Sequence, residues 1–422
     1  MVAVMALSSA TAGCGDDHAV LDAALPDAAV VDAMADGATD ARPDAPVDAA
    51  VDAMPDAMPD AAVPLSSALD PTFGQGGSYT FPAVGGMGAI TSAPGGDIVA
   101  CGPSRAVEDL NLGAAAWLGR VDGGGVGPGQ VWVLGPTNAH ESCASVAVLT
   151  SGHVAVVTAS RLLIRDVGGG PVAELPFDVS HRLLQVAAAP DGGLWAVGVE
   201  GLWRYDGGLS PVAAFGVGGL VAMTDAVGLA VHGANLTTAR VTVATRTRQV
   251  RRVHGDSGAP DLAFAGTGTA TVPIPAGWPG GELRAIVGRA DGGVAVMTDW
   301  DPPDAGTHYG VAPLTAAGVA GPSVSGSQLA IGSAAVDASD RVWWPSSEGF
   351  AFLDQRLFVT RTDPTVTSTA AIMVVPPPAT ATCRYAAAGA VVSGGIVVGY
   401  SAREVAPPLP LRYSARVVRL AP

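Results

Sequence analysis

The feature that most constrains the fold is a nine-residue segment that recurs along the chain. Leu69–Gly77 reads LDPTFGQGG, and Pro260–Gly268 reads PDLAFAGTG. A partial copy, FGVGG, occupies Phe215–Gly219. The intervals between the three phenylalanines are 142 and 49 residues, and the longer interval is close to three times the shorter. A period of about 48 residues is typical of a repeat architecture, in which each repeat is one supersecondary unit.

A smaller unit recurs around these copies and consists of two short apolar runs joined by a turn. Typical turns are Pro94–Asp97, Pro190–Gly193 and Ala290–Gly293, and Val and Ala fill the flanking runs. Apolar runs bounded by Asp-Gly or Gly-Gly predict β-hairpins. Seven hairpins are predicted, at Gly88–Gly102, Cys143–Thr158, Leu184–Gly198, Val221–Gly233, Leu283–Thr298, Gly332–Trp344 and Arg384–Tyr400.

A third apolar run, a looser turn and a fourth run follow the hairpins. The third run is Trp117–Val121 in the first unit, Leu202–Tyr205 in the third and Ala351–Asp354 in the sixth, and Gln130–Leu134 is a fourth run. Four strands in about fifty residues are the dimensions of a β-propeller blade. No window combines a 3.6-residue apolar period with helix caps, so almost no helix is expected.

We therefore predict an all-β fold, a single seven-bladed β-propeller of four-stranded antiparallel blades over residues 65–422. The segment Leu411–Leu420 at the end of the sequence has the pattern of a third run. A strand at Tyr79–Phe81 would then supply the fourth run of the last blade. This pairing would close the ring and protect the strand edges.

The recurring segment itself is expected to be structural. An Asp at its start would cap the turn with its side chain, and the phenylalanines would pack between blades. These repeat positions are Asp70, Phe73, Gly77, Phe215, Gly219, Asp261, Phe264 and Gly268.

Two stretches also carry a family resemblance. Leu69–Gly77 followed by the hairpin residues Gly95–Ala100 resembles the delta-60 repeat family of bacterial secreted proteins, whose repeats are thought to build propellers. Asp191–Gly198 followed by Gly201–Tyr205 is similar to sensor-type and NHL-type propeller blades. Together the resemblance covers residues 69–421. It implies a fold rather than a reaction, because propellers host many unrelated activities.

The N-terminal segment resembles a bacterial lipoprotein signal peptide. Residues 1–13 form a short apolar run that ends in small residues directly before Cys14. The resemblance implies cleavage before Cys14 and attachment of lipid to its thiol.

Residues 14–64 read as an acidic tether rich in Ala, Asp and Pro. From Asp32 to Asp60 an Asp occurs at every fourth position, and prolines interrupt the spacing. Proline breaks helices, like charges four residues apart repel, and the tether has no aromatic residue that could anchor a core. We therefore predict a disordered, extended tail that holds most of the net charge of −16.

Composition excludes several classes of function. All 22 basic residues are Arg, which excludes mechanisms that need a lysine. The acidic balance argues against a nucleic-acid partner, which would need a clustered basic face. The uncharged stretch Tyr385–Ser401 contains Ser393–Gly395, a turn sequence, so it is predicted to be a buried hairpin rather than a membrane span.

The cysteines and histidines predict a disulfide but no metal site. Cys101, Cys143 and Cys383 fall at strand ends that should lie on one rim of the ring, and disulfides are expected in exported proteins. The preferred pair is Cys101–Cys143 in adjacent units, and Cys101–Cys383 across the closure is the alternative. No metal-ligand spacing occurs, so no metal, cofactor or catalytic residue is predicted.

Two loops of the fifth unit, Val272–Glu282 and Trp300–His308, are rich in Pro and Gly. Loops on a rigid scaffold often carry function, so we predict a binding rim there. Its candidate residues are Trp278, Trp300, Asp301, Asp304 and His308.

The predicted function is that of an exported, lipid-anchored protein of the cell envelope. It would be a monomeric outer-membrane-associated lipoprotein, at the cell surface or in the periplasm, that touches the membrane only through its lipid. Its propeller would be a non-catalytic binding or structural module for a protein or glycan. One alternative is a hydrolase or lyase with its site in the central channel, although the inner strands are nearly all Val, Ala and Gly. Another is an extracytoplasmic sensor module.

Overall fold

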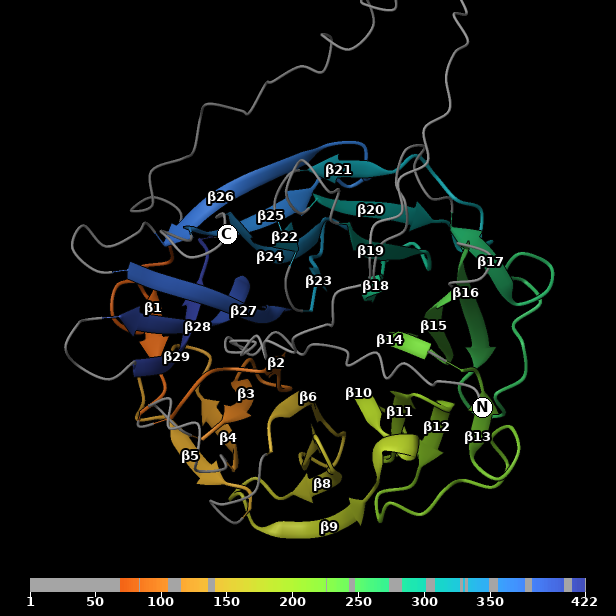
Figure 1. Ribbon diagram of the computed structural model, residues 1–422, viewed down its shortest axis with the longest axis horizontal. Helices are drawn as coiled ribbons and strands as arrows, with labels where there is room; N and C mark the ends of the chain where they lie inside the picture. Colours follow the sequence, from red (N-terminus) through yellow and green to blue (C-terminus); the bar gives the residue numbers. More distant parts are fainter. Residues whose placement is uncertain are drawn as a thin grey trace, which may run out of the picture. The chain divides into compact units, whose positions relative to one another are not determined.

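The protein is described from a computed structural model. The structure describes residues 69–82, 84–104, 115–135, 141–224, 226–242, 247–272, 283–300, 308–326, 329–330, 333–348, 356–375, 382–405 and 412–421. The predicted signal peptide (1–13), Cys14 and the tether (14–64) lie outside these residues. In the described part, seven antiparallel sheets form a ring of blades (Figure 1), so the predicted seven-bladed propeller is confirmed.

The strands of each blade follow one another from the centre of the ring outward. Blade 1 comprises β2 (Ala89–Ser92), β3 (Ile98–Pro103), β4 (Ala116–Val121) and β5 (Gln130–Val133). Blade 2 comprises β6 (Cys143–Val148), β7 (Val154–Thr158), β8 (Arg161–Arg165) and β9 (Pro171–Pro176). Blade 3 comprises β10 (Leu183–Ala188), β11 (Leu194–Gly198), β12 (Gly201–Tyr205) and β13 (Leu220–Ala222). Blade 4 comprises β14 (Ala226–His232), β15 (Asn235–Thr242), β16 (Thr247–His254) and β17 (Thr269–Val272).

The remaining blades follow the same plan with one variation. Blade 5 comprises β18 (Leu283–Gly288), β19 (Val294–Trp300), β20 (His308–Leu314) and β21 (Val324–Gly326). In blade 6, β22 (Leu329–Ala330) and β23 (Ala335–Val336) both pair with β24 (Val342–Glu348), which β25 (Arg356–Thr362) and β26 (Thr369–Val375) follow. Blade 7 comprises β27 (Thr382–Val392), β28 (Ile396–Val405), β29 (Arg412–Arg419) and β1 (Ser78–Thr80).

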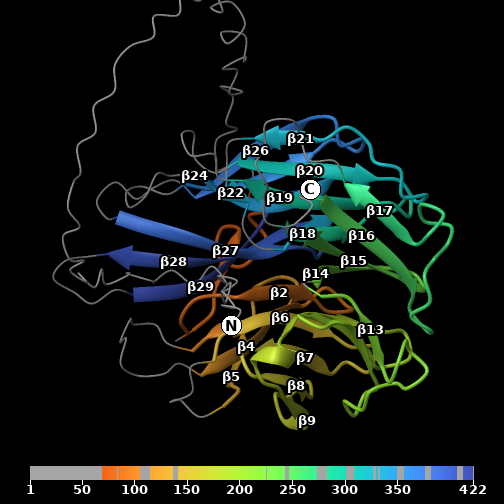
Figure 2. The ribbon, with the colours of Figure 1, turned by 45° about the vertical axis from the view of Figure 1, so that its right-hand side comes forward.

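Blade 7 closes the ring with a strand from the other end of the sequence. β1 pairs antiparallel with β29, with Ser78 opposite Val418 and Thr80 opposite Arg416. The predicted closure is therefore confirmed, although the strand begins one residue earlier than expected. Figure 2 shows the ring turned, with the inner strands β2 and β6 of neighbouring blades side by side.

Helix is almost absent from the described residues, as the sequence predicts. A 3-10 turn, η1 (Val179–His181), connects blades 2 and 3. Within the described ranges, no helix has the length and apolar character needed to cross a membrane.

Two strand predictions are wrong. The predicted hairpin Val221–Gly233 is instead the passage from β13, the outer strand of blade 3, to β14, the inner strand of blade 4. The hairpin of blade 4 lies further on, where Gly233 takes a positive φ of 54° between β14 and β15. The third strand of blade 6 is β25, whereas the predicted run Ala351–Asp354 lies outside the described residues.

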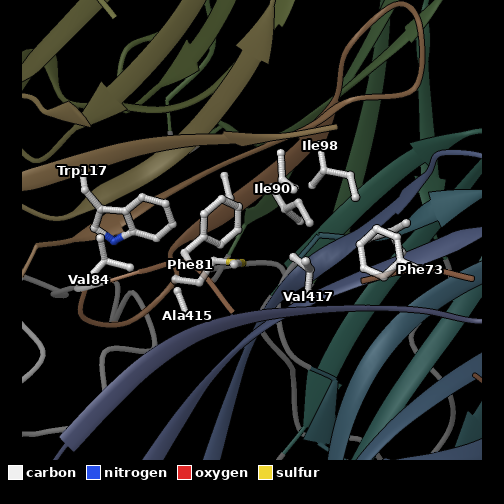
Figure 3. Close-up of a cluster of buried hydrophobic side chains, with 12 residues drawn as sticks. Phe73, Phe81, Val84, Ile90, Ile98, Trp117, Ala415 and Val417 are labelled. Carbon is white, nitrogen blue, oxygen red and sulfur yellow. The ribbon is translucent and has the colours of Figure 1, made fainter. Parts of the chain in front are cut away.

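The three recurring phenylalanines occupy equivalent places. Phe215 and Phe264 lie in the turns between the third and fourth strands of their blades, and Phe73 lies in the segment that leads into β1, the fourth strand of blade 7. All three are 0% exposed. We call the contact surface of two neighbouring blades a seam. Phe73 packs in seam 7/1, Phe215 in seam 3/4 and Phe264 in seam 4/5. Figure 3 shows Phe73 in the cluster that fills seam 7/1.

A backbone hydrogen bond accompanies each phenylalanine and reaches the equivalent turn of the next blade. The residue after the phenylalanine donates its N–H at 2.9, 2.8 and 2.8 Å, respectively. The donor and acceptor pairs are Gly74 N to Gly124 O, Gly216 N to Ser257 O, and Ala265 N to Ala317 O. The recurring segment therefore joins one blade to the next, through the packing of its phenylalanine and through this hydrogen bond.

The aspartates that begin two of the copies cap their turns. Asp70 Oδ1 accepts a hydrogen bond from Thr72 N at 2.9 Å, and Asp261 Oδ1 accepts one from Ala263 N at 3.0 Å. The hydrogen bonds from Thr72, aided by Arg419, lower the pKa of Asp70. Arg419 also ties the closing blade to its neighbour, since its guanidinium donates to Gly123 O of blade 1 at 2.6 Å.

Candidate functional site

The described part of the predicted binding rim is small. Trp300 ends β19 and His308 begins β20, and the two residues face each other as Cα partners. Their backbones are therefore brought together at the end of one hairpin. Trp278, Asp301 and Asp304 lie outside the described residues.

A disulfide joins blades 1 and 2. Cys101 of β3 and Cys143 of β6 are bonded, with their Cα atoms 5.8 Å apart and both residues buried. This is the pair that the sequence favoured over Cys101–Cys383. Cys383 lies in β27, where its Cα partner is Glu404.

Two polar side chains of the inner strands connect neighbouring blades. Ser145 Oγ accepts a hydrogen bond from Val186 N at 3.1 Å, across seam 2/3. Gln185 Oε1 accepts one from Leu229 N at 2.9 Å, across seam 3/4. Among the residues that the structure covers, no three His, Cys, Asp or Glu side chains converge in a group that could hold a metal ion.

A cavity of about 520 Å³ opens in seam 2/3, between β9 of blade 2 and β12 of blade 3. We call it the groove. Its volume falls within the range typical of ligand sites. Its lining is mostly apolar and consists of Leu175, Pro176, Phe177, Asp178, His181, Leu183, Trp203, Tyr205 and Pro211.

The third strand of blade 3 supplies the aromatic wall of the groove. Trp203 and Tyr205 lie two residues apart on β12 and so face the same side of the sheet. Their rings stack with centroids 5.8 Å apart and planes at 17°. Tyr205 is buried, whereas Trp203 is partly exposed. Between them, Arg204 points to the opposite face and donates to Leu194 O at 3.0 Å, which fixes the strand.

The aromatic wall carries two hydrogen-bond donors. Neither the Trp203 indole N–H nor the Tyr205 hydroxyl has a hydrogen-bond partner within the described residues. Burial, together with the negative charge of Glu200, raises the pKa of Tyr205 to about 12. The hydroxyl therefore keeps its proton at physiological pH and remains able to donate.

The 3-10 turn η1 supplies a polar end to the groove. Asp178 caps this turn, since its Oδ1 accepts from Ser180 N at 2.9 Å and from His181 N at 3.1 Å. The His181 ring lies between two carboxylates, with Nδ1 2.9 Å from Asp178 Oδ1 and Nε2 3.5 Å from Glu200 Oε1. The hydrogen bonds from Ser180 and His181 hold the pKa of Asp178 well below its usual range. The hydrogen bond to Asp178, with the charge of Glu200, raises the pKa of His181.

Ser180, His181 and Asp178 include the residue types of a hydrolytic triad, but not its geometry. In a triad the serine and the carboxylate contact opposite ring nitrogens of the histidine. Here Ser180 Oγ and Asp178 Oδ1 both approach His181 Nδ1, at 3.0 and 2.9 Å. Ser180 Oγ also donates directly to Asp178 Oδ1 at 2.6 Å. The arrangement caps a turn and does not activate a nucleophile.

Comparisons with known proteins show the fold. No family model and no curated protein matches the chain. A solved structure titled "YCF48 bound to D1 peptide" is similar, with a TM-score of 0.50, 11% identity, and 82% of this chain and 96% of that chain covered. The WD40 domain of Neurospora crassa Pan2 has a TM-score of 0.50 and 10% identity, with coverage of 84% and 96%. At these identities the likeness shows the propeller fold alone.

Proposed function

We propose that the protein is an exported, lipid-anchored binding module of the cell envelope, and that its propeller holds an extended segment of a partner protein in the groove. The observation that carries this proposal is the groove itself. A mostly apolar cleft with a few well-placed polar groups is the usual form of a ligand site. Trp203 is partly exposed there and offers an unpartnered N–H, and tryptophans in such positions often dominate binding energy.

A polypeptide ligand also agrees with a known use of the fold. The similar propeller YCF48 is described as bound to a peptide. A non-catalytic role is favoured because the Ser180, His181 and Asp178 side chains at the groove are arranged as a cap.

The proposal of export and lipid anchoring rests on three features. The disulfide between Cys101 and Cys143 is of a kind that persists in oxidising compartments. Cys14 follows a segment that resembles a lipoprotein signal peptide, and the turn at Leu69–Gly77 resembles a repeat of secreted proteins. Incorporation of radiolabelled fatty acid should occur in the full chain and disappear in Cys14→Ala. Equal labelling of both chains would contradict the anchor.

The binding proposal is tested with an array of twelve-residue peptides of random sequence, probed with the full-length chain. Trp203→Ala should lose the signals that the wild-type chain gives. Val217→Ala is the matched control. Val217 lies in the same blade, its side chain is 88% exposed, and it does not line the groove. Signals that survive in Trp203→Ala, or an array without any signal, would contradict the proposal.

A further inference from the structure

The chemistry of the groove narrows the class of partner. We infer that the groove binds an extended, proline-containing peptide in polyproline II conformation, with an arginine or lysine beside the prolines. This inference rests on the proposed function. It follows from the kinds of hydrogen-bonding group that the groove offers and from the arrangement of its walls.

The aromatic wall offers hydrogen-bond donors, so a ligand that fits it must supply hydrogen-bond acceptors. The Trp203 indole N–H can only donate, and the Tyr205 hydroxyl, which keeps its proton, can donate as well. A peptide in polyproline II conformation has no internal hydrogen bonds, so its carbonyl groups are free to accept. Its prolines have no N–H that burial would leave without a partner. Proline rings also present flat apolar faces to the Trp203 and Phe177 rings.

The walls of the groove suit the docking of side chains better than the addition of a strand. A peptide that extends a sheet needs free N–H and C=O groups on the edge strand. The edge strand here, β9, begins with Pro171 and ends with Pro176, which have no N–H, and Phe177 N already donates to Ser160 O at 2.9 Å. Aromatic-lined grooves are the usual receptors of proline-rich segments.

A sugar fits the groove less well. A sugar ring carries hydroxyl groups around its edge, and each would need a hydrogen-bond partner once buried. The side chains that line the groove offer two donors on the aromatic wall and one unpartnered carboxylate oxygen, Asp178 Oδ2, at the polar end. Asp178 Oδ1 already accepts from Ser180 and His181. The sparse donors along an apolar wall match a peptide backbone instead.

The polar end of the groove selects a cation. The carboxylate of Asp178 is 71% exposed, and its Oδ2 has no hydrogen-bond partner in the described part of the chain. A guanidinium or ammonium group of the ligand can bind this oxygen while the aromatic wall holds the prolines.

The test is fluorescence anisotropy with four labelled synthetic peptides and the full-length chain. The peptides carry four prolines or four alanines, followed by Arg or by Glu. The proline–arginine peptide should bind most tightly. Trp203→Ala should weaken its binding by at least about tenfold, and Tyr205→Phe, which removes only the hydroxyl, by about fivefold. Val217→Ala should leave binding unchanged.

Two further variants separate the contacts. Trp203→Phe keeps an aromatic ring but removes the N–H, so it should weaken binding less than Trp203→Ala while the seam stays packed. Asp178→Asn should reduce the preference for arginine over glutamate and leave the preference for proline over alanine. Equal binding of the proline and alanine peptides, or tighter binding of cellohexaose than of any peptide, would overturn the inference. If random peptides still bound through Trp203 in that case, the proposed function would hold even though the inference about proline and arginine would be wrong.

Discussion

Seam 7/1 and seam 2/3 are built on the same plan, yet one is filled and the other holds the groove. In both, a phenylalanine follows the outermost strand of the preceding blade, and its backbone N–H donates to the neighbouring strand or to the turn that precedes that strand. Phe81 N donates to Ala415 O at 3.0 Å, and Phe177 N donates to Ser160 O at 2.9 Å. Phe81 is 1% exposed, whereas Phe177 is only partly buried.

The difference lies on the third strand of the blade that each phenylalanine faces. Blade 1 has Trp117 and Gly119 on β4, whereas blade 3 has Gly201 and Trp203 at the matching positions of β12. In seam 7/1 the Phe81 ring lies directly over Gly119, with ring centroids of Phe81 and Trp117 5.2 Å apart (Figure 3). The Trp117 indole N–H donates to Gly86 O at 2.9 Å.

A shift of one tryptophan by two positions thus accompanies the change from a packed seam to a groove. Trp203 occupies the position where Gly119 makes room for Phe81. Its ring stacks on Tyr205, and its N–H remains without a described partner. Seam 7/1 is therefore packed by aromatic rings, whereas seam 2/3 lacks part of that packing and holds the groove.

The largest expected effect is the loss of stability when an aromatic ring is removed from the filled seam, seam 7/1. Trp117→Ala or Phe81→Ala should lower the free energy of unfolding by about 3–5 kcal/mol, because each removes a fully buried ring. Phe177→Ala should lower it by about 1 kcal/mol or less, because water already reaches that ring. Chemical denaturation of the three variants gives the comparison. Similar losses in both seams would contradict it.

A smaller loss of stability is expected when a side chain is added at Gly119. A Cβ there would lie 2.8 Å from Trp117 Cζ3 and 2.9 Å from Phe81 Cδ1. Gly119→Ala should therefore cost about 1–3 kcal/mol through overpacking. The matched control is Gly207→Ala in blade 3, where the nearest atom, Gly192 O, would be 3.4 Å away. Equal melting temperatures for the two variants would show that seam 7/1 can expand to take the methyl group, and would contradict the statement that this seam is filled.

The smallest expected effect is the pH dependence that the contact between His181 and Asp178 gives to stability at the groove. Asp178 raises the pKa of His181, so the stability from this pair is complete below about pH 6.5 and is lost as the pH rises through the folded-state pKa. Asp178→Asn should return the pKa of His181 toward its ordinary value. An NMR titration of the His181 ring measures this shift, and an unchanged midpoint would show that the contact is absent in solution.

Much of the fold could be predicted because its signals are local and repeated. The turn of Leu69–Gly77 and its copies fixes a period, and Gly-rich turns mark the hairpins. The error at Val221–Gly233 has a physical cause. A passage between blades consists of two apolar runs around a short turn, and so does a hairpin. The local sequence pattern therefore cannot distinguish a passage between blades from a hairpin.

The groove could not be predicted from any one segment. It depends on Phe177 and Trp203 meeting across a seam. Trp203 lies in the run Gly201–Tyr205 that resembles a propeller blade, but that run does not indicate which residue the ring faces. One signal was nevertheless present in the sequence. When the third runs are aligned on Arg120 and Arg204, the residue before the arginine is Gly119 in one run and Trp203 in the other. A bulky ring where blade 1 has a glycine indicates that the two seams are packed differently.

The most direct test of the account is a crystal structure of the full-length chain with the proline–arginine peptide bound. We predict peptide density in seam 2/3, with prolines against Trp203 and Phe177 and the arginine at Asp178. Seam 7/1 should remain closed over Phe81. Peptide bound elsewhere on the propeller, with the groove empty, would contradict the claim that seam 2/3 is the binding site.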